Sequence, residues 1–205
     1  LIRYKTYKHY KGGVYQFIRS AILIRETFGA TGCKVYFAWE GGELLRRQLW
    51  NGYKNRVRNP DVVAQEKILR AILVRFGWRQ VHSPGWEADD VIATIAARAR
   101  ESVGIYTGDH DLHQCVTATT HCISPTPKHF DLADGVAWRQ QDVLRKWSVE
   151  PLRVPDVKAL CGDSSDGIPG ARGIGDTWAG PMIAQFGTLS ALIEDCVAQG
   201  TSAVV

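Results

Sequence analysis

The chain has 205 residues, of which 45% are hydrophobic and 22% are charged. This composition is ordinary for a globular protein, and no run of 18 apolar residues predicts a membrane span. The five cysteines are scattered without a C-x-x-C pair. Their pattern argues against a zinc site or a disulfide framework and favours a reducing compartment.

The net charge of +4 is unevenly distributed along the chain. Residues 1–80 contain 16 Lys and Arg against 5 Asp and Glu, whereas residues 81–205 contain 9 against 16. A basic first part suggests a polyanionic partner, and an acidic second part suggests bound cations. A basic face is often only a solvated face, so charge by itself does not decide the function.

The predicted elements alternate between helix and strand over most of the chain. In order they are a helix at 17–28, a strand at 35–38, a basic and aromatic segment at 43–56, a helix from an Asp61 N-cap to 77, a strand at 79–82, a helix at 87–100, a strand at 103–106 and a strand at 121–123. From about Val154 the pattern changes to helix, glycine-rich turn and helix. The alternation predicts an α/β fold with a mostly parallel sheet and helices on both faces.

Three acidic groups are the most informative feature. They comprise Glu87, Asp89 and Asp90; Asp109 and Asp111; and Asp163 and Asp166. Each group alone has an ordinary explanation as a helix cap or an Asx-type turn. Together they predict a convergent cluster at one sheet edge, which hard divalent cations such as Mg²⁺ or Mn²⁺ would neutralise. Two such ions can promote phosphodiester hydrolysis, which suggests a nuclease or a phosphatase.

Two other segments have the residue types of nucleic-acid contacts. The glycines between Gly167 and Gly175 can present backbone N–H groups to phosphates at a helix N-terminus, although an ordinary turn between helices is the alternative. Basic and aromatic residues alternate from Arg46 to Arg58 and include Trp50. This segment could bind a single strand or be a plain amphipathic surface helix. The other tryptophans, Trp178 among them, are interpreted as packing residues.

Four segments, in this order, resemble the bacterial and phage 5′→3′ exonuclease (flap endonuclease) family, which includes the N-terminal nuclease domain of DNA polymerase I. Tyr53-Lys54 is similar to the Tyr-Lys of the family's helical arch. The segments at 85–93 (GWEADDVIA), 107–112 (TGDHDL) and 160–170 (LCGDSSDGIPG) resemble its three acidic motifs. The last is followed by the familiar G-I-G at 173–175.

The resemblance implies a PIN-like nuclease domain at 1–150 and a helix–three-turn–helix DNA-binding region at 151–205. It implies two Mg²⁺ ions (or Mn²⁺) held by the three acidic groups and by Glu40, and K⁺ at the glycine-rich turn. The implied phosphate-contacting residues are Lys54, Arg46 and Arg47. The implied DNA-binding residues are Tyr53, Arg56, Gly170, Arg172, Gly173 and Gly175. The implied partner is a 5′ flap, nicked or branched DNA duplex, with a DNA polymerase as a second partner. We expect a cytoplasmic monomer with no membrane association, in a bacterium or a phage-infected cell.

The chain also departs from the family pattern. Glu40 stands where the family has Asp, His110 replaces a Lys, Gly167 replaces an Asn, and Pro181 falls within the second helix of the turn module. The family's first strand and its metal-binding Asp have no counterpart before Leu1-Ile2-Arg3-Tyr4, so we expect a chain shortened at both ends. Two alternatives therefore stay open: a DNA-binding relic with impaired catalysis, and an RNA-cleaving PIN-type enzyme.

Overall fold

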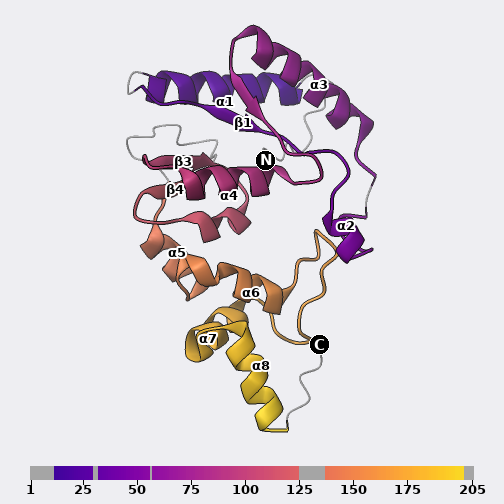
Figure 1. Ribbon diagram of the computed structural model, residues 1–205, viewed down its shortest axis with the longest axis vertical. Coiled ribbons are helices and arrows are strands. Elements are labelled where there is room, and N and C mark those ends of the chain that lie inside the picture. Colours follow the sequence, from indigo (N-terminus) through magenta and orange to yellow (C-terminus); the bar gives the residue numbers. More distant parts are fainter. Residues whose placement is uncertain (1–11, 30–31, 56, 125–136, 201–205) are drawn as a thin grey trace. The chain divides into compact units, whose positions relative to one another are not determined.

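The computed structural model describes residues 12–29, 32–55, 57–124 and 137–200. The chain divides into two compact units (Figure 1). Unit 1 comprises the described residues of 1–45 and 56–95, and unit 2 comprises those of 46–55, 96–124 and 137–205. No helix in the described ranges is long and apolar enough to cross a membrane.

Unit 1 combines helices with a two-stranded parallel sheet. Its elements are α1 (Gly12–Gly29), β1 (Tyr36–Ala38), α3 (Pro60–Arg75), β2 (Arg79–Val81) and most of α4 (Ala88–Arg98). Tyr36 pairs with Arg79 and Ala38 with Val81, and α1 contacts α3. The hydrogen bond from Trp39 N to Val81 O extends the pairing one step beyond β1. The ends of β1 and β2 therefore lie side by side, where Glu40 and the start of α4 follow.

An aromatic cluster packs over this small sheet. The rings of Phe17 and Phe37 are 5.5 Å apart, and those of Phe37 and Trp78 are stacked at 5.3 Å. Phe17 also stacks on Trp39 at 6.0 Å, and the Arg70 guanidinium lies 4.7 Å from the Trp39 ring centroid. Aromatic pairs at these separations stabilise a fold beyond the area that they bury. The cluster thus joins α1 to the strand that leads to Glu40.

Unit 2 contains the other sheet and the C-terminal helices. Its elements are α2 (Arg46–Leu49), β3 (Val103–Tyr106), η1 (His110–Cys115), β4 (Thr120–Ile123), β5 (Ala137–Trp138), α5 (Gln140–Trp147), η2 (Pro151–Arg153), α6 (Val154–Cys161), α7 (Asp176–Phe186) and α8 (Leu189–Ala198). Strand β3 pairs in parallel with β4, and β4 pairs antiparallel with β5. The strand order in this sheet is β3-β4-β5. The helix η1, which follows β3, contacts α6.

The core of unit 2 lies among η1, α5, α6 and α7. Its fully buried side chains include Leu112, Val143, Val154, Val157 and Ile183. Helix α6 contacts both α7 and α8, as its place beside them in Figure 1 shows. The helical turn module predicted at the C-terminal end is therefore present as α6, a glycine-rich loop and α7.

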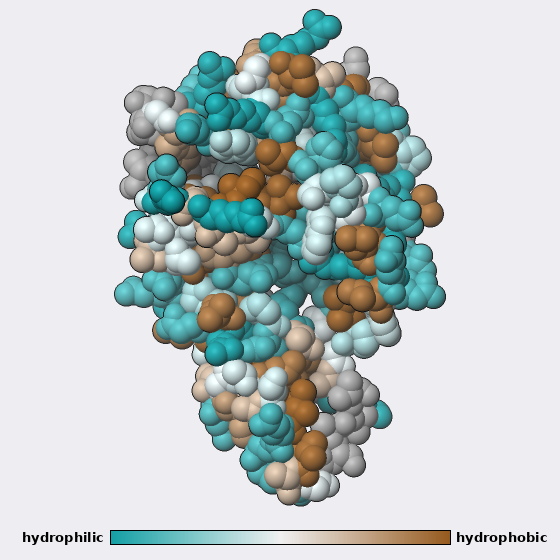
Figure 2. All heavy atoms as spheres, in the orientation of Figure 1, coloured by the Kyte–Doolittle hydropathy of each residue, from teal (hydrophilic) through white to brown (hydrophobic). Residues whose placement is uncertain are grey.

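Apolar side chains also reach the surface of the C-terminal helices (Figure 2). Trp178 in α7 is 67% exposed, and Ile193 and Val197 in α8 are exposed as well. The prediction that Trp178 packs inside the protein is therefore wrong.

The backbone corrects one local prediction, the N-cap of α3, and agrees with another, the place of Pro181. The N-cap of α3 is Asn59, whose Oδ1 accepts a hydrogen bond from Asp61 N at 2.8 Å. Asp61 is instead in the first turn behind Pro60, where proline is favoured because its missing N–H would have no partner. Helix α7 begins at Asp176, and Pro181 lies inside it, as the sequence pattern predicted.

Candidate active site

The first acidic group lies in unit 1, at the start of α4. Glu87 is 4% exposed, and its backbone N–H donates to Asp90 Oδ2 at 3.0 Å. Asp90 therefore caps the helix, as the ordinary interpretation of this group predicts. Asp89 lies in the same first turn, where the helix dipole favours negative charge.

Glu40 belongs to the same neighbourhood. Gly41 N donates to Trp86 O at 2.9 Å, and Gly85 N donates to Gly41 O at 3.1 Å. These bonds hold the loop after β1 against the loop before α4. The half-buried Glu40 and the buried Glu87 thus lie on adjacent, hydrogen-bonded segments of unit 1.

The second group follows β3 in unit 2. Asp109 N donates to the Oγ1 of the buried Thr107 at 2.9 Å. The Asp109 side chain caps η1 by accepting from Asp111 N at 3.1 Å. The Asp-x-Asp turn is thus a real local structure, and it presents the Asp111 carboxylate toward α6, where Lys158 Nζ lies 3.1 Å from Asp111 Oδ1.

The third group occupies the loop after α6. Asp163 Oδ1 accepts hydrogen bonds from Ser165 N (2.9 Å), Ser165 Oγ (2.7 Å) and Asp166 N (3.2 Å). A backbone bridge between Asp163 and Ile168 closes the loop. Burial alone would raise the pKa of Asp163, but the hydrogen bonds from Ser165 and Lys158 outweigh it and lower that pKa to about 2. Asp163 is therefore ionised at neutral pH and orders its own loop.

Lys158, which no sequence motif singled out, joins the second group to the third. Its Nζ lies 2.9 Å from Asp163 Oδ2 and 3.1 Å from Asp111 Oδ1. Burial would lower the pKa of Lys158, yet the two carboxylates raise it well above its usual range. Burial raises the pKa of Asp111, against the opposing effect of Lys158. The signal in the sequence was a lysine beside the apolar positions of α6, one turn before an acidic loop.

This geometry bears on the divalent metal that the resemblance implies. Within the described parts of the chain, no group of three or more Asp, Glu, His or Cys side chains lies close enough to hold a metal ion. Asp111 and Asp163 nevertheless meet at one cation, the Lys158 ammonium. Two carboxylates that share a cation are the oxygen donors that Mg²⁺ prefers. The donor chemistry of this pair therefore fits a hard divalent ion.

The basic segment of unit 2 is a compact turn with only a short helix, α2. Arg46 and Arg47 are in α2, and Arg47 Nη2 donates to Lys54 O at 3.1 Å. Lys54 Nζ lies 3.6 Å from Asp166 Oδ2, so the turn reaches the third acidic group. Tyr53 is 6% exposed, so its ring is buried within the protein, and its contact with DNA stays a prediction. Arg56 lies outside the described residues.

The glycine-rich turn has two different parts. A side chain at Gly170 would collide with Cys161 O, so this exposed glycine allows a close backbone approach that closes the acidic loop. Gly173 and Gly175 have open space around them, and Gly175 is the N-cap of α7. Arg172 is exposed beside them. The second part of the turn thus offers an accessible helix N-terminus with an adjacent cation, as phosphate binding requires.

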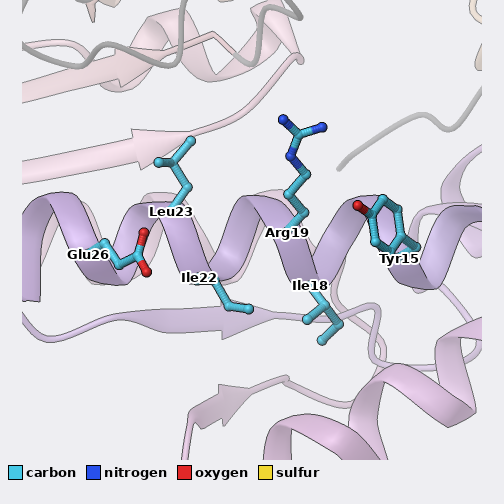
Figure 3. A pocket seen from close by; sticks show the side chains of 6 residues that line it. All are labelled: Tyr15, Ile18, Arg19, Ile22, Leu23 and Glu26. Carbon is cyan, nitrogen blue, oxygen red and sulfur yellow. The ribbon is translucent and has the colours of Figure 1, made fainter.

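A separate hollow runs along α1 in unit 1 (Figure 3). The six side chains that line it, all from α1, are Tyr15, Ile18, Arg19, Ile22, Leu23 and Glu26. None of them is a candidate site residue. The pocket is therefore not the chemical site predicted from the acidic motifs.

Comparisons with known protein families agree with these motifs. Residues 3–148 match the family described as "5′-3′ exonuclease, N-terminal resolvase-like domain", and residues 149–203 match "5′-3′ exonuclease, C-terminal SAM fold". The chain belongs to the 5′-3′ exonuclease family. The predicted family and the PIN-like α/β fold class are thereby confirmed. The division at residue 150 stays a prediction.

Relatives of known sequence extend this assignment. A 5′-3′ exonuclease of Halalkalibacterium halodurans is 37% identical over 84% of this chain and 57% of the relative. The thermostable DNA polymerase I of Thermus filiformis is 32% identical over 89% of this chain but 21% of the polymerase. The chain thus spans between about a fifth and three fifths of the length of these relatives.

Solved structures share the fold. The phage T5 D15 protein crystallised with metal ions superposes with a TM-score of 0.70, at 18% identity, over 91% of this chain and 73% of that protein. The catalytic core of Rad2 in complex with DNA superposes with a TM-score of 0.61, at 19% identity, over 93% of this chain and 58% of that one. At these identities the superpositions establish the architecture alone.

Proposed function

We propose that this chain is the catalytic region of a divalent-metal-dependent 5′→3′ exonuclease and flap endonuclease that hydrolyses DNA. The observation that carries the proposal is the meeting of Asp111 and Asp163 at one cation, with Lys54 beside Asp166 in the same unit. Family membership and the named 5′-3′ exonuclease relatives support the reaction class. The substrate would be a 5′ flap, nicked or branched duplex.

Each group of residues has a defined task in this proposal. The acidic residues would be ligands of divalent ions, two Mg²⁺ or Mn²⁺ in all. These residues are Asp109, Asp111, Asp163 and Asp166 in unit 2, and Glu40, Glu87, Asp89 and Asp90 in unit 1. When bound, such a pair activates a water and stabilises the leaving oxygen of a phosphodiester. Lys54, with Arg46 or Arg47, would orient the scissile phosphate. This assignment uses oxygen ligands alone, in keeping with the chemistry of hard cations.

Lys158 would act before and during metal binding. Its ammonium holds the Asp111 and Asp163 carboxylates close together when they would otherwise repel each other. When Asp111 and Asp163 hold a divalent ion, the Lys158 ammonium would leave them and turn toward solvent or a substrate phosphate. The chain would thus keep its acidic pair in position at a modest electrostatic cost.

The turn after α6 would bind the duplex backbone. Gly173 and Gly175 leave room for a phosphate at the N-terminus of α7, and Arg172 adds a charge. Contacts of this kind position DNA without reading its sequence. A K⁺ ion at this turn belongs to the same proposal, as does action together with a DNA polymerase.

A flap-cleavage assay tests the proposal. A duplex with a labelled 5′ flap is incubated with the chain in Mg²⁺, in Mn²⁺ and in EDTA. We expect release of the flap only with a divalent ion, and a loss of about 100-fold or more in Asp163→Asn and Asp111→Asn. Both variants should still bind the flap DNA. Binding without cleavage by the wild-type chain in either metal would overturn the proposal in favour of a DNA-binding relic.

A further inference from the structure

The turn at 50–54 is joined to the acidic loop at 163–168 by contacts that the nuclease motifs do not explain. The Trp50 indole Nε1 donates to Gly167 O at 2.9 Å. The backbone N–H of Lys54 donates to Asp166 O at 3.0 Å, beside the ion pair of their side chains at 3.6 Å. Two segments more than a hundred residues apart thus share three polar contacts.

The turn is also constrained internally. Tyr53 N donates to Trp50 O at 3.0 Å, and Arg47 Nη2 donates to Lys54 O at 3.1 Å. Lys54 has a φ of 45°, in the left-handed region that residues with a Cβ rarely adopt. Such a conformation persists only where surrounding contacts enforce it. Here those contacts place the only ammonium of the turn at Asp166.

A close backbone approach makes these contacts possible. A Cβ at Gly167 would collide with the carbonyl oxygen of Gly52, and Gly167 has a φ of 73°. The indole of Trp50 lies over Gly52, since a Cβ at Gly52 would meet Trp50 Nε1. Two glycines and one indole therefore form a fitted contact between the turn and the loop.

We propose that Trp50 is a positioning residue, which acts through Lys54: its indole N–H holds the turn on the acidic loop and so places the Lys54 ammonium at Asp166. This inference rests on the proposed nuclease function, in which Lys54 orients the scissile phosphate and Asp166 holds a metal ion. It replaces the interpretation of Trp50 as a ring that stacks on unpaired bases. The half-exposed ring already uses its one polar group within the protein.

Trp50→Phe distinguishes positioning from stacking, because phenylalanine keeps an aromatic face but lacks the N–H. Amide hydrogen exchange of Lys54 is the first measurement, and we expect it to be about fivefold faster in the variant without DNA. Leu49→Ala is the matched control, since Leu49 is adjacent and 87% exposed. Unchanged exchange in Trp50→Phe would overturn the inference.

Cleavage kinetics give the second measurement. We expect kcat on the flap substrate to fall about three- to tenfold in Trp50→Phe with little change in KM. In a Lys54→Ala background the same substitution should have no further effect, because Trp50 acts through Lys54. Additive effects, or a raised KM with unchanged kcat, would identify Trp50 as a substrate contact and overturn the inference.

A glycine substitution tests the same contact from the other side. Asparagine tolerates a positive φ, but its Cβ at Gly167 would displace the Gly52 carbonyl, so Gly167→Asn should speed exchange at Lys54 as Trp50→Phe does. Gly187→Asn is the control, because Gly187 has a φ of 82° and open space around it. Equal effects of both substitutions would overturn the inference. Absence of cleavage by the wild-type chain would overturn the proposed function, whereas the exchange data alone decide whether Trp50 holds the turn.

Discussion

Both units cap acidic residues with backbone N–H groups, and the described contacts of unit 2 add two lysines. In unit 1 the start of α4 uses backbone groups: Asp90 accepts the Glu87 N–H, and the helix dipole favours the negative charges of the first turn. In unit 2 Asp109 and Asp163 likewise accept backbone N–H groups, but lysine ammonium groups also contact the carboxylates, with Lys158 between Asp111 and Asp163 and Lys54 at Asp166. A backbone dipole stays in place when a cation binds, whereas a lysine can be displaced. Substitutions at the lysines of unit 2 should therefore change the response of the protein's stability to added Mg²⁺ more than substitutions at the start of α4.

The largest expected effect concerns the buried histidine beneath the second acidic group. His113 is 1% exposed, accepts the Trp147 indole N–H at 3.0 Å and packs 4.4 Å from the Trp138 ring. Burial lowers the pKa of His113 to about 4, with smaller contributions from His110 and Lys146. This pKa lies below that of histidine in the unfolded chain. The contribution of neutral His113 to the free energy of unfolding is therefore fully present above about pH 6.5 and is lost as the pH falls toward 4.

The loss over this range should reach at most about 3 kcal/mol. Urea unfolding in EDTA between pH 7.5 and 4 measures it, with His113→Gln as the reference, because glutamine can accept the Trp147 N–H but does not titrate. The excess stability of the wild type over this variant should shrink with falling pH. A difference that stays constant would show that His113 does not titrate as its burial implies.

The next effect separates the two units directly. Lys158→Met removes the ammonium between Asp111 and Asp163 and should lower the free energy of unfolding in EDTA by about 2 kcal/mol. Saturating Mg²⁺ should then raise the Tm of the variant more than that of the wild type, because the ion meets no competing ammonium. Lys158→Arg, which retains the charge, is the control. If Mg²⁺ raised the Tm of all three proteins equally, Lys158 would not be displaced by the ion, and the lysine would act like the fixed backbone groups of unit 1.

In unit 1 the corresponding change removes the cap of α4. Asp90→Ala deletes the acceptor for the Glu87 N–H and should cost about 1 kcal/mol of stability in EDTA. Asp90→Asn retains an acceptor and should recover most of this loss. Chemical denaturation of the three proteins checks the order. If Asp90→Asn were as unstable as Asp90→Ala, the charge rather than the cap would stabilise the helix.

The smallest effect is expected for the Lys54–Asp166 ion pair, which is partly exposed and has 3.6 Å between Lys54 Nζ and Asp166 Oδ2. Lys54→Met should lower stability by about 0.5 kcal/mol, and the difference from wild type should diminish in 1 M salt. Thermal unfolding at low and high ionic strength measures it. If Lys54→Met lost as much stability as Lys158→Met, the two lysines would contribute equally to the free energy of unfolding.

Sequence patterns identified most elements up to Ile123, and the family, because both depend on local patterns, but β5, α5 and α8 were not predicted. Helices α3 and α4 follow from apolar spacing, within a few positions of their observed ends. The three acidic motifs each lie within a few residues, so their ordinary roles as caps and turns were also visible. Asp90, Asp109 and Asp163 do accept local backbone N–H groups as those readings predicted. The assignment to the 5′-3′ exonuclease family used the order of these motifs and was confirmed.

Only the tertiary structure decided which residues meet across the chain. Lys158 forms an ion pair with Asp111 because α6 packs against η1. Trp50 donates a hydrogen bond to Gly167 O because two glycines allow the backbones to approach closely. The burial of Tyr53 and the exposure of Trp178 were likewise not encoded in their immediate neighbours. Residue type and spacing specify a helix or a turn through interactions of a few residues. Burial and long-range partners depend instead on how elements distant in the sequence pack together, and local patterns contain no measure of that packing.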